Sequence, residues 1–185
     1  MSQRFFIALL PPASMQDEVR QIQYDLRDRY KTKATLKSPP HITLIPPFEL
    51  AKKCLEPLQI ELEKFAKTRS PFTINLSGFA AFPPLVIYLN VLPNTILQKL
   101  YVDIAATLAN NLDILDPYAS RPYAPHMTVG FRDLTPENFE LAWAEFRDRQ
   151  ISFEFEAINL TLLAHDGQKW NVFSKFTLQP LEESL

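Results

Sequence analysis

The pentapeptide Pro40-His41-Ile42-Thr43-Leu44 returns 85 residues later as Pro125-His126-Met127-Thr128-Val129, and the two copies contain two of the chain's three histidines. In each copy aliphatic residues alternate with a His and a Thr, which is typical of a short strand with a period of two. The imidazole and the hydroxyl then share one face of the strand, and the aliphatic side chains occupy the other. The repeat therefore predicts two strands that each present an imidazole beside a hydroxyl. The plainer alternative is a pair of core strands whose histidines are only hydrogen-bonded.

The sequence around the motifs alternates between strand and helix patterns. We expect strands at residues 5–10, 41–45, 72–76, 85–91, 126–129, 153–155, 158–162 and 170–178, and helices at 15–30, 55–65, 97–108 and 136–149. Ser14 and Thr135 are expected to cap the first and last of these helices, and residues 78–84 to form a turn. This order predicts an α+β fold with an internal pseudo-repeat that brings the two motifs face to face.

Composition limits the classes of partner. The 185 residues are 46% hydrophobic and 22% charged, which suffices for one well-buried core or for two small lobes that share an interface. The formal net charge of −2 argues against long duplex DNA as a partner, because no global positive field is present. A small or single-stranded phosphate ligand remains compatible with this charge.

The remaining composition features concern compartment and assembly. Cys54 is the only cysteine, which excludes an internal disulfide and a cysteine-based zinc cluster and fits a reducing compartment. The apolar run near the N-terminus ends at Pro11-Pro12 and is too short for a signal peptide or a membrane span. We therefore expect a cytoplasmic protein with no membrane partner, and a monomer, since nothing in the pattern demands a second chain.

Two facing imidazoles suit one kind of chemistry in particular. In-line attack on phosphorus needs a base at the incoming oxygen and an acid at the leaving oxygen, on opposite sides of the phosphate. Imidazole serves in either role because its ordinary pKa lies near the operating pH. A hydroxyl beside each imidazole can donate a hydrogen bond to a non-bridging phosphate oxygen. The motifs therefore predict phosphodiester hydrolysis with His41 and His126 as catalytic residues, and with Thr43 and Thr128 binding the phosphate.

The chain resembles the 2H phosphoesterases, and within them the bacterial 2′–5′ RNA ligase-like or RNA 2′,3′-cyclic phosphodiesterase group. Beyond the two motifs, the segment 4–9 (RFFIAL) looks like the opening strand of that family. The segment 78–84 (GFAAFPP), followed by 86–89 (VIYL), looks like its central glycine, aromatic and proline segment. Residues 121–125 (RPYAP) look like its lead into the second motif, so the resemblance covers nearly the whole chain.

The resemblance implies one domain over residues 1–185, with two pseudo-symmetric lobes, two antiparallel sheets facing a central cleft and helices packed outside. It implies opening of an RNA or nucleoside 2′,3′-cyclic phosphate to a 2′-phosphate without metal or any other cofactor. Some relatives also join RNA ends through a 2′–5′ bond. By analogy His41 is the acid at the leaving 3′ oxygen and His126 the base on water. The partners implied are RNA ends or small cyclic-phosphate nucleotides.

One position departs from the family pattern. Many relatives carry an arginine five positions after the second histidine, where this chain has Phe131, with Arg132 next to it. Continued strand alternation would place Arg132 on the face of His126 and Phe131 on the other. Arg132 is therefore a candidate phosphate-binding residue, with a surface role as the alternative, and ligase activity is the property that this departure puts in question.

Several further residues have two interpretations. Phe48, Phe82 and Tyr123 are candidates for stacking on a base, with core packing as the alternative. His165 is expected to be an exposed residue of a turn rather than a third imidazole at the cleft. The five basic residues between Arg27 and Lys37 suit the solvated end of a helix better than a path for RNA phosphates.

Two other functions compete with the phosphodiesterase. A metal site would need His41 and His126 to join a carboxylate, and the histidine spacing gives it little support. The rival outside enzymes is a catalytically silent module that binds an RNA end or a nucleotide in the same pocket. Turnover of a cyclic phosphate separates the enzyme from the silent module.

Overall fold

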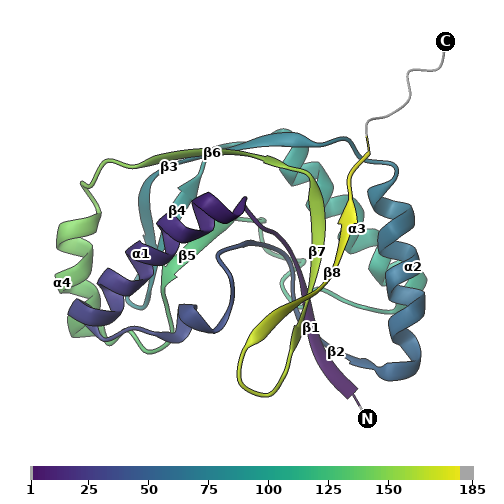
Figure 1. Ribbon diagram of the computed structural model, residues 1–185, viewed down its shortest axis with the longest axis horizontal. Coiled ribbons are helices and arrows are strands. Elements are labelled where there is room, and N and C mark those ends of the chain that lie inside the picture. Colours follow the sequence, from purple (N-terminus) through teal and green to yellow (C-terminus); the bar gives the residue numbers. More distant parts are fainter. Residues whose placement is uncertain (1, 180–185) are drawn as a thin grey trace.

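The computed structural model describes residues 2–179 as two four-stranded antiparallel sheets with helices packed on them (Figure 1). The first sheet has the order β2-β1-β7-β8, with bounds Ile42–Ala51, Ser2–Leu9, Asn159–His165 and Trp170–Thr177. The second sheet has the order β5-β4-β3-β6, with bounds His126–Gly130, Val86–Val91, Phe72–Phe82 and Ser152–Ala157. The motif strands β2 and β5 are edge strands of different sheets, and they contact each other.

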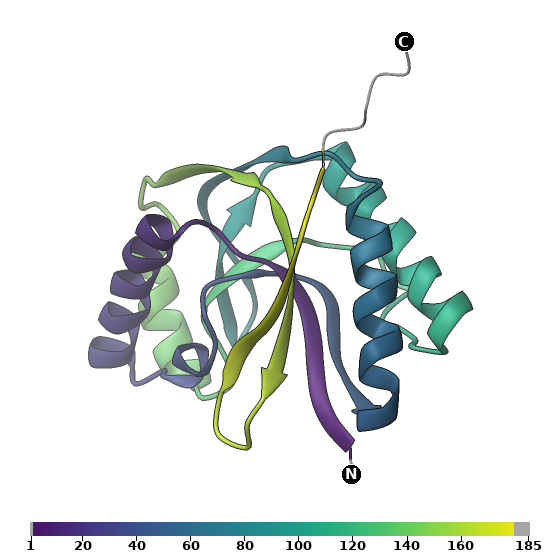
Figure 2. The same cartoon turned by 45° about the vertical axis from the view of Figure 1, so that its right-hand side comes forward.

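Four α-helices lie in two pairs on either side of the strands (Figures 1 and 2). Their bounds are Ala13–Tyr30 for α1, Leu55–Ala66 for α2, Thr95–Leu112 for α3 and Pro136–Phe146 for α4, and short 3₁₀ helices span Ala34–Lys37 and Lys52–Cys54. Helix α1 packs beside α4, and α2 packs beside α3. The spacing of apolar residues predicted all four, because their buried side chains recur at helical intervals.

The two halves of the chain share one connection pattern. The unit β1-α1-β2 leads to the first motif strand, and the unit β4-α3-β5 leads to the second. Each of these helices packs against the motif strand of the other unit, α1 on β5 and α3 on β2. This exchange joins the two sheets where the motifs lie, and it confirms the predicted α+β fold with two pseudo-duplicated lobes.

The core explains why β1 is apolar on both faces. Phe5, Ile7 and Leu9 are buried in the main hydrophobic core, which extends under both sheets and all four helices. Phe6 and Ala8 point the other way and form a smaller cluster with Leu163 of β7. A strand that is buried on both faces has a continuous apolar sequence. The sequence pattern therefore did not predict that the two faces of β1 belong to different hydrophobic clusters.

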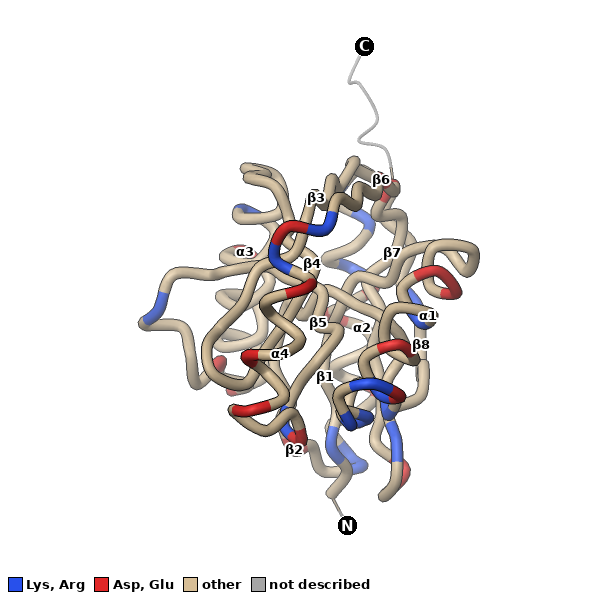
Figure 3. The backbone as a smooth tube through the Cα atoms, turned by 90° about the vertical axis from the view of Figure 1, so that its left-hand side faces the viewer, with Lys and Arg blue, Asp and Glu red and all other residues tan. Residues whose placement is uncertain are grey.

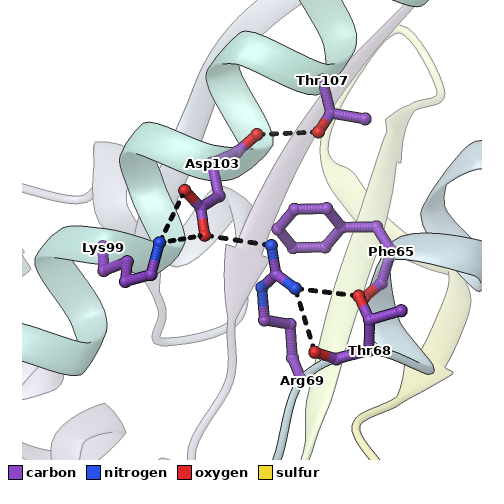
Figure 4. Close-up of polar contacts among 6 residues, drawn as sticks. All are labelled: Phe65, Thr68, Arg69, Lys99, Asp103 and Thr107. Atoms are coloured by element: carbon purple, nitrogen blue, oxygen red, sulfur yellow. Dashed lines mark hydrogen bonds and ion pairs between the residues drawn. The ribbon is translucent and has the colours of Figure 1, made fainter.

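Ion pairs tie the helices to each other at the surface. Just after α2, Arg69 pairs with Asp103 of α3 at 3.0 Å and lies over the ring of Phe65, while Lys99 reaches the same carboxylate (Figure 4). On the other side, Arg29 of α1 pairs with Glu145 of α4. Basic and acidic residues are interspersed over that side of the molecule, as Figure 3 shows. Charge there serves helix packing and forms no single-sign field.

Three local predictions are wrong. Strand β2 continues to Ala51 through Pro46 and Pro47 instead of ending near residue 45, which an edge strand tolerates because it needs fewer N–H donors. Residues 78–82 belong to β3 rather than to a turn, since a register shift at Gly78, where φ is +68°, lets the strand continue. Helix α1 begins after Pro12 with no side-chain cap, so Ser14 is inside it.

Candidate functional site

Both motifs line a single cleft of about 790 Å³ between the sheets. His41 directly precedes β2 and His126 is the first residue of β5. Both histidines and both threonines line the cleft, whereas Ile42 and Met127 between them are fully buried. The alternation predicted from the pentapeptides is therefore present in both strands. The cleft brings together side chains that are 85 residues apart in the chain.

The two imidazoles are held in the same way. Nδ1 of His41 lies 2.7 Å from the carbonyl oxygen of Pro39, and Nδ1 of His126 lies 2.7 Å from that of Ala124, in each case two residues earlier. A carbonyl oxygen only accepts hydrogen bonds, so each Nδ1 carries the proton and donates it. In the neutral ring Nε2 then keeps its lone pair, and both histidines present a proton acceptor.

Burial favours the neutral form of both rings. The pKa of His41 is lowered to about 4, and loss of solvent on burial is the main cause. The hydrogen bond to Pro39 acts in the opposite direction, and the electrostatic effects of His126 and Arg20 lower the pKa by smaller amounts. Loss of solvent also lowers the pKa of His126, against the effect of its bond to Ala124. The charge that His126 can carry is one of the smaller causes that lower the pKa of His41, and both rings line the same cleft.

The motif threonines are held by their backbone and leave their hydroxyls available. The carbonyl oxygen of Thr43 accepts a hydrogen bond from the Tyr123 hydroxyl at 2.8 Å, and that of Thr128 accepts one from Gln23 Nε2 at 3.1 Å. Within residues 2–179 neither threonine hydroxyl has a hydrogen-bond partner. Two hydroxyl donors are thus free to bind a ligand in the cleft.

Helix α1 fixes both motif segments through two polar side chains that the sequence did not single out. Arg20 donates to the carbonyl oxygen of Ser38 at 2.8 Å, just before the first motif, and to Gln23 Oε1 at 2.9 Å. Gln23 is 1% exposed and in turn holds Thr128 of the second motif. Gln23 follows Val19 by four positions and therefore lies on the apolar face of the helix. An amide side chain at such a position needs a hydrogen-bond partner, and this is the sequence signal that could have revealed the link.

The three candidate stacking residues lie in different surroundings. Phe82 lines the cleft, is 41% exposed, and has its ring centroid 5.1 Å from that of His126. Tyr123 also lines the cleft, but its ring is stacked on Tyr101 at 4.1 Å and its hydroxyl is bound to Thr43. Phe48 packs against Phe5 and the core and is not part of the cleft lining. Phe82 is the one of the three with an exposed surface beside a motif imidazole.

The cleft is more basic than the chain as a whole. Its lining contains four cations and one carboxylate, namely Arg4, Lys37, Arg121 and Arg132 with Asp116. Among residues 2–179 none of these four cations has a carboxylate partner, and the Asp116 carboxylate accepts a hydrogen bond from Tyr101. Unpaired cations around two neutral imidazoles make a site suited to anions.

Arg132 reaches the cleft by a different route from the one predicted. Strand β5 ends at Gly130, and Arg132 has a φ of +59° in the bend that follows, so strand alternation does not extend to it. Both Phe131 and Arg132 line the cleft, with the guanidinium 5.0 Å from the Phe131 ring. The expectation that these two residues face opposite sides is therefore wrong, while the place of Arg132 near the motifs stands.

Two other expectations concern His165 and the basic segment. His165 ends β7 and lines the cleft, so its expected place in an exposed turn is wrong. Of the basic residues between 27 and 37 only Lys37 lines the cleft, since Arg27 and Arg29 pair with carboxylates on the outer surface. Arg27 and Arg29 lie in the last turn of α1, as predicted, whereas Lys31, Lys33 and Lys37 follow the helix.

Neither a metal-binding cluster nor a membrane-spanning helix is present in the described part of the chain. Within residues 2–179, no cluster of three or more His, Cys, Asp or Glu side chains could hold a metal ion. In the same part of the chain, no helix has the length and apolar character needed to cross a membrane.

The α+β fold places two matched motifs on edge strands of different sheets, and both motifs line one cleft. Residues 11–169 match the family model of the 2′-5′ RNA ligase superfamily, and the chain belongs to this family of 2H phosphoesterases. The family named from the resemblance is thereby confirmed.

The chain is also similar to curated relatives in sequence and to solved structures in fold. The chain is 28% identical over 179 residues to "Putative phosphoesterase GK0864" of Geobacillus kaustophilus, covering 94% of this chain and 95% of that one. The fold is similar to that of E. coli LigT in apo form, with a TM-score of 0.71, 18% identity and coverage of 97% and 99%. It is also similar to that of TT0787 of Thermus thermophilus, with a TM-score of 0.70, 20% identity and coverage of 95% and 97%.

Proposed function

We propose that this protein is a metal-independent phosphodiesterase that opens RNA or nucleoside 2′,3′-cyclic phosphates to 2′-phosphates. The observation that carries the proposal is the pair of matched imidazoles, one from each sheet, that line one cleft beside unpaired hydroxyls. E. coli LigT, which shares the fold, has been crystallised with 3′-AMP and with ATP, and nucleotide ligands of that kind suit the basic cleft.

The reaction assigns one proton transfer to each imidazole. Water attacks phosphorus and gives a proton to one Nε2, while the bond from phosphorus to the 3′ oxygen breaks and that oxygen takes a proton from the other imidazole. The hydroxyls of Thr43 and Thr128 donate to the non-bridging oxygens as charge moves in the transition state. Arg132 supplies positive charge to the same phosphate. With a 5′-hydroxyl in place of water as the nucleophile, the same steps would join a 2′,3′-cyclic end to a 5′-hydroxyl end through a 2′–5′ bond and release the 3′-hydroxyl.

The roles of the two histidines depend on which one holds a proton. The resemblance makes His41 the acid, but its pKa of about 4 leaves it unprotonated near pH 7 in the free protein. A bound phosphate anion would raise the pKa of both imidazoles by favouring their charged forms. His41 can serve as the acid once the phosphate has bound, and the free protein offers two bases.

Turnover measurements test the proposal directly. His41→Ala and His126→Ala should each lower kcat on a nucleoside 2′,3′-cyclic phosphate by at least about a hundredfold, as loss of a general acid or base does. ³¹P NMR should identify the product as a 2′-phosphate, and activity should survive a chelator. Lys175→Ala, on the exposed surface of β8 outside the cleft, is the control.

Three results would contradict the proposal. Full activity in both alanine variants would remove the histidines from the mechanism, and loss of activity in a chelator would favour a metal. Nucleotide binding without turnover by the unmutated protein would favour the silent binding module.

A further inference from the structure

A group of aromatic and basic side chains on the first sheet lies in the cleft but outside both motifs. We name it the Arg4–Trp170 corner and define it by Arg4 and Phe6 of β1, His165 at the end of β7 and Trp170 at the start of β8. Phe6 belongs to the small hydrophobic cluster on the cleft side of the sheet, against which Trp170 packs. The catalytic proposal gives this corner no role.

The corner is continuous with the first motif. The ring centroid of Phe6 lies 4.8 Å from that of His41 and 4.7 Å from that of Trp170, which it meets edge to face. Trp170 in turn contacts His165 at 4.8 Å. An unbroken row of rings therefore leads from the His41 imidazole along the cleft to Trp170 and His165.

The chemistry of the corner suits a nucleotide. The Arg4 guanidinium lies 5.2 Å from the Trp170 ring centroid, and within residues 2–179 it has no carboxylate partner. An arginine in this position can bind a phosphate, and its planar guanidinium can itself stack on a base. His165 accepts the Gly167 N–H on Nδ1, so Nε2 carries the proton of the neutral ring and is a hydrogen-bond donor.

The cleft thus has aromatic surfaces near both imidazoles. On the second sheet, the exposed ring of Phe82 contacts His126. On the first sheet, Phe6 lies between His41 and Trp170 and contacts both rings. A single nucleoside held by its phosphate between the imidazoles has one base and can occupy one of these surfaces. A dinucleotide has two bases, which match the two aromatic surfaces. It also has a second phosphate between its nucleosides, and Arg4 offers a cation for that phosphate.

We propose that the Arg4–Trp170 corner binds the penultimate nucleotide of an RNA strand, with its base on Trp170 and the linking phosphate on Arg4. This inference rests on the proposed function, because it places the terminal phosphate between His41 and His126. The preferred ligand is then an RNA end of two or more nucleotides rather than a mononucleotide.

Binding of unreactive product-like ligands tests the corner without requiring turnover. Calorimetry compares adenosine 2′-phosphate with adenylyl-adenosine 2′-phosphate, which differ by one nucleotide. The unmutated protein should bind the dinucleotide about tenfold more tightly, a typical effect of one stacked base. Trp170→Ala and Arg4→Gln should each abolish most of this preference. Arg4→Gln should also weaken the dependence of dinucleotide affinity on salt concentration. Lys175→Ala on the same strand as Trp170 should retain the preference.

The outcomes separate this inference from the catalytic proposal. Equal affinity for the two ligands in the unmutated protein would overturn the inference, even if cyclic phosphates are hydrolysed. An equal loss of affinity for both ligands in the two variants would also overturn it, since the corner would then only support His41. A dinucleotide preference that depends on Trp170 and Arg4, in a protein without turnover, would uphold the corner and refute the phosphodiesterase.

Discussion

Acidification from pH 7 to pH 5 should destabilise the native protein through His41. Its pKa is about 4 in the folded chain, mainly because burial removes solvent from the charged ring, against an ordinary value of 6.5. Between these two values the unfolded chain binds a proton that the native protein does not bind. The free energy of unfolding therefore falls as the pH falls through this interval, and it is fully recovered above about pH 6.5.

The magnitude follows from the same two pKa values. The difference between the two pKa values corresponds to about 3 kcal/mol of unfolding free energy, and about 2 kcal/mol of this is lost on going down to pH 5. His126 contributes with the same sign, because burial lowers its pKa too. The carboxyls of Glu145 and Asp166, with pKa values of about 2, lose their contributions below this interval. A comparison of pH 7 with pH 5 therefore isolates mainly the two motif histidines.

Urea unfolding at both pH values measures the effect. The unmutated protein should lose about 2 kcal/mol or more between pH 7 and pH 5, and His41→Asn, which keeps a donor for the Pro39 carbonyl, should lose about 2 kcal/mol less. NMR titration of the imidazoles gives the native pKa directly, and a chain with three histidines is simple to assign. An equal acid loss in His41→Asn, or a native titration midpoint of His41 at or above 6.5, would refute the reasoning.

Two further predictions concern contacts that only the folded chain forms. Tyr123→Phe removes the hydroxyl that binds the Thr43 carbonyl, so we expect a loss of about 1 kcal/mol in unfolding free energy and a lower kcat. The control variant Tyr24→Phe on α1 should change neither quantity. Equal effects of the two variants would argue against a role for Tyr123 in holding the motifs. Arg69→Ala should cost up to about 1 kcal/mol, more than Lys99→Ala, because the Arg69 side chain is 32% exposed and that of Lys99 76%. The reverse order in chemical denaturation would contradict this ranking.

Short-range patterns account for most of what could be predicted. Alternation in the two pentapeptides assigned the histidines and threonines to one face, and helical spacing located all four helices. Periodicity is a property of neighbouring residues, so it can be detected in the sequence without knowledge of the fold. It failed at Gly78, where a positive φ continues a strand, and at Arg132, where a bend replaces the strand. Both positions depend on backbone geometry that the residue pattern does not encode.

The sequence by itself determined the pair of motifs, the α+β class and the residue types available for acid and base chemistry. Only the tertiary structure decided that both motif strands are edge strands in contact, that burial lowers the pKa of both imidazoles, and that Gln23 and Tyr123 hold the motif backbones. It also placed Arg4 and Trp170, 166 residues apart, in one corner of the cleft. Packing between distant segments creates burial and long-range hydrogen bonds, and these have no counterpart in local sequence.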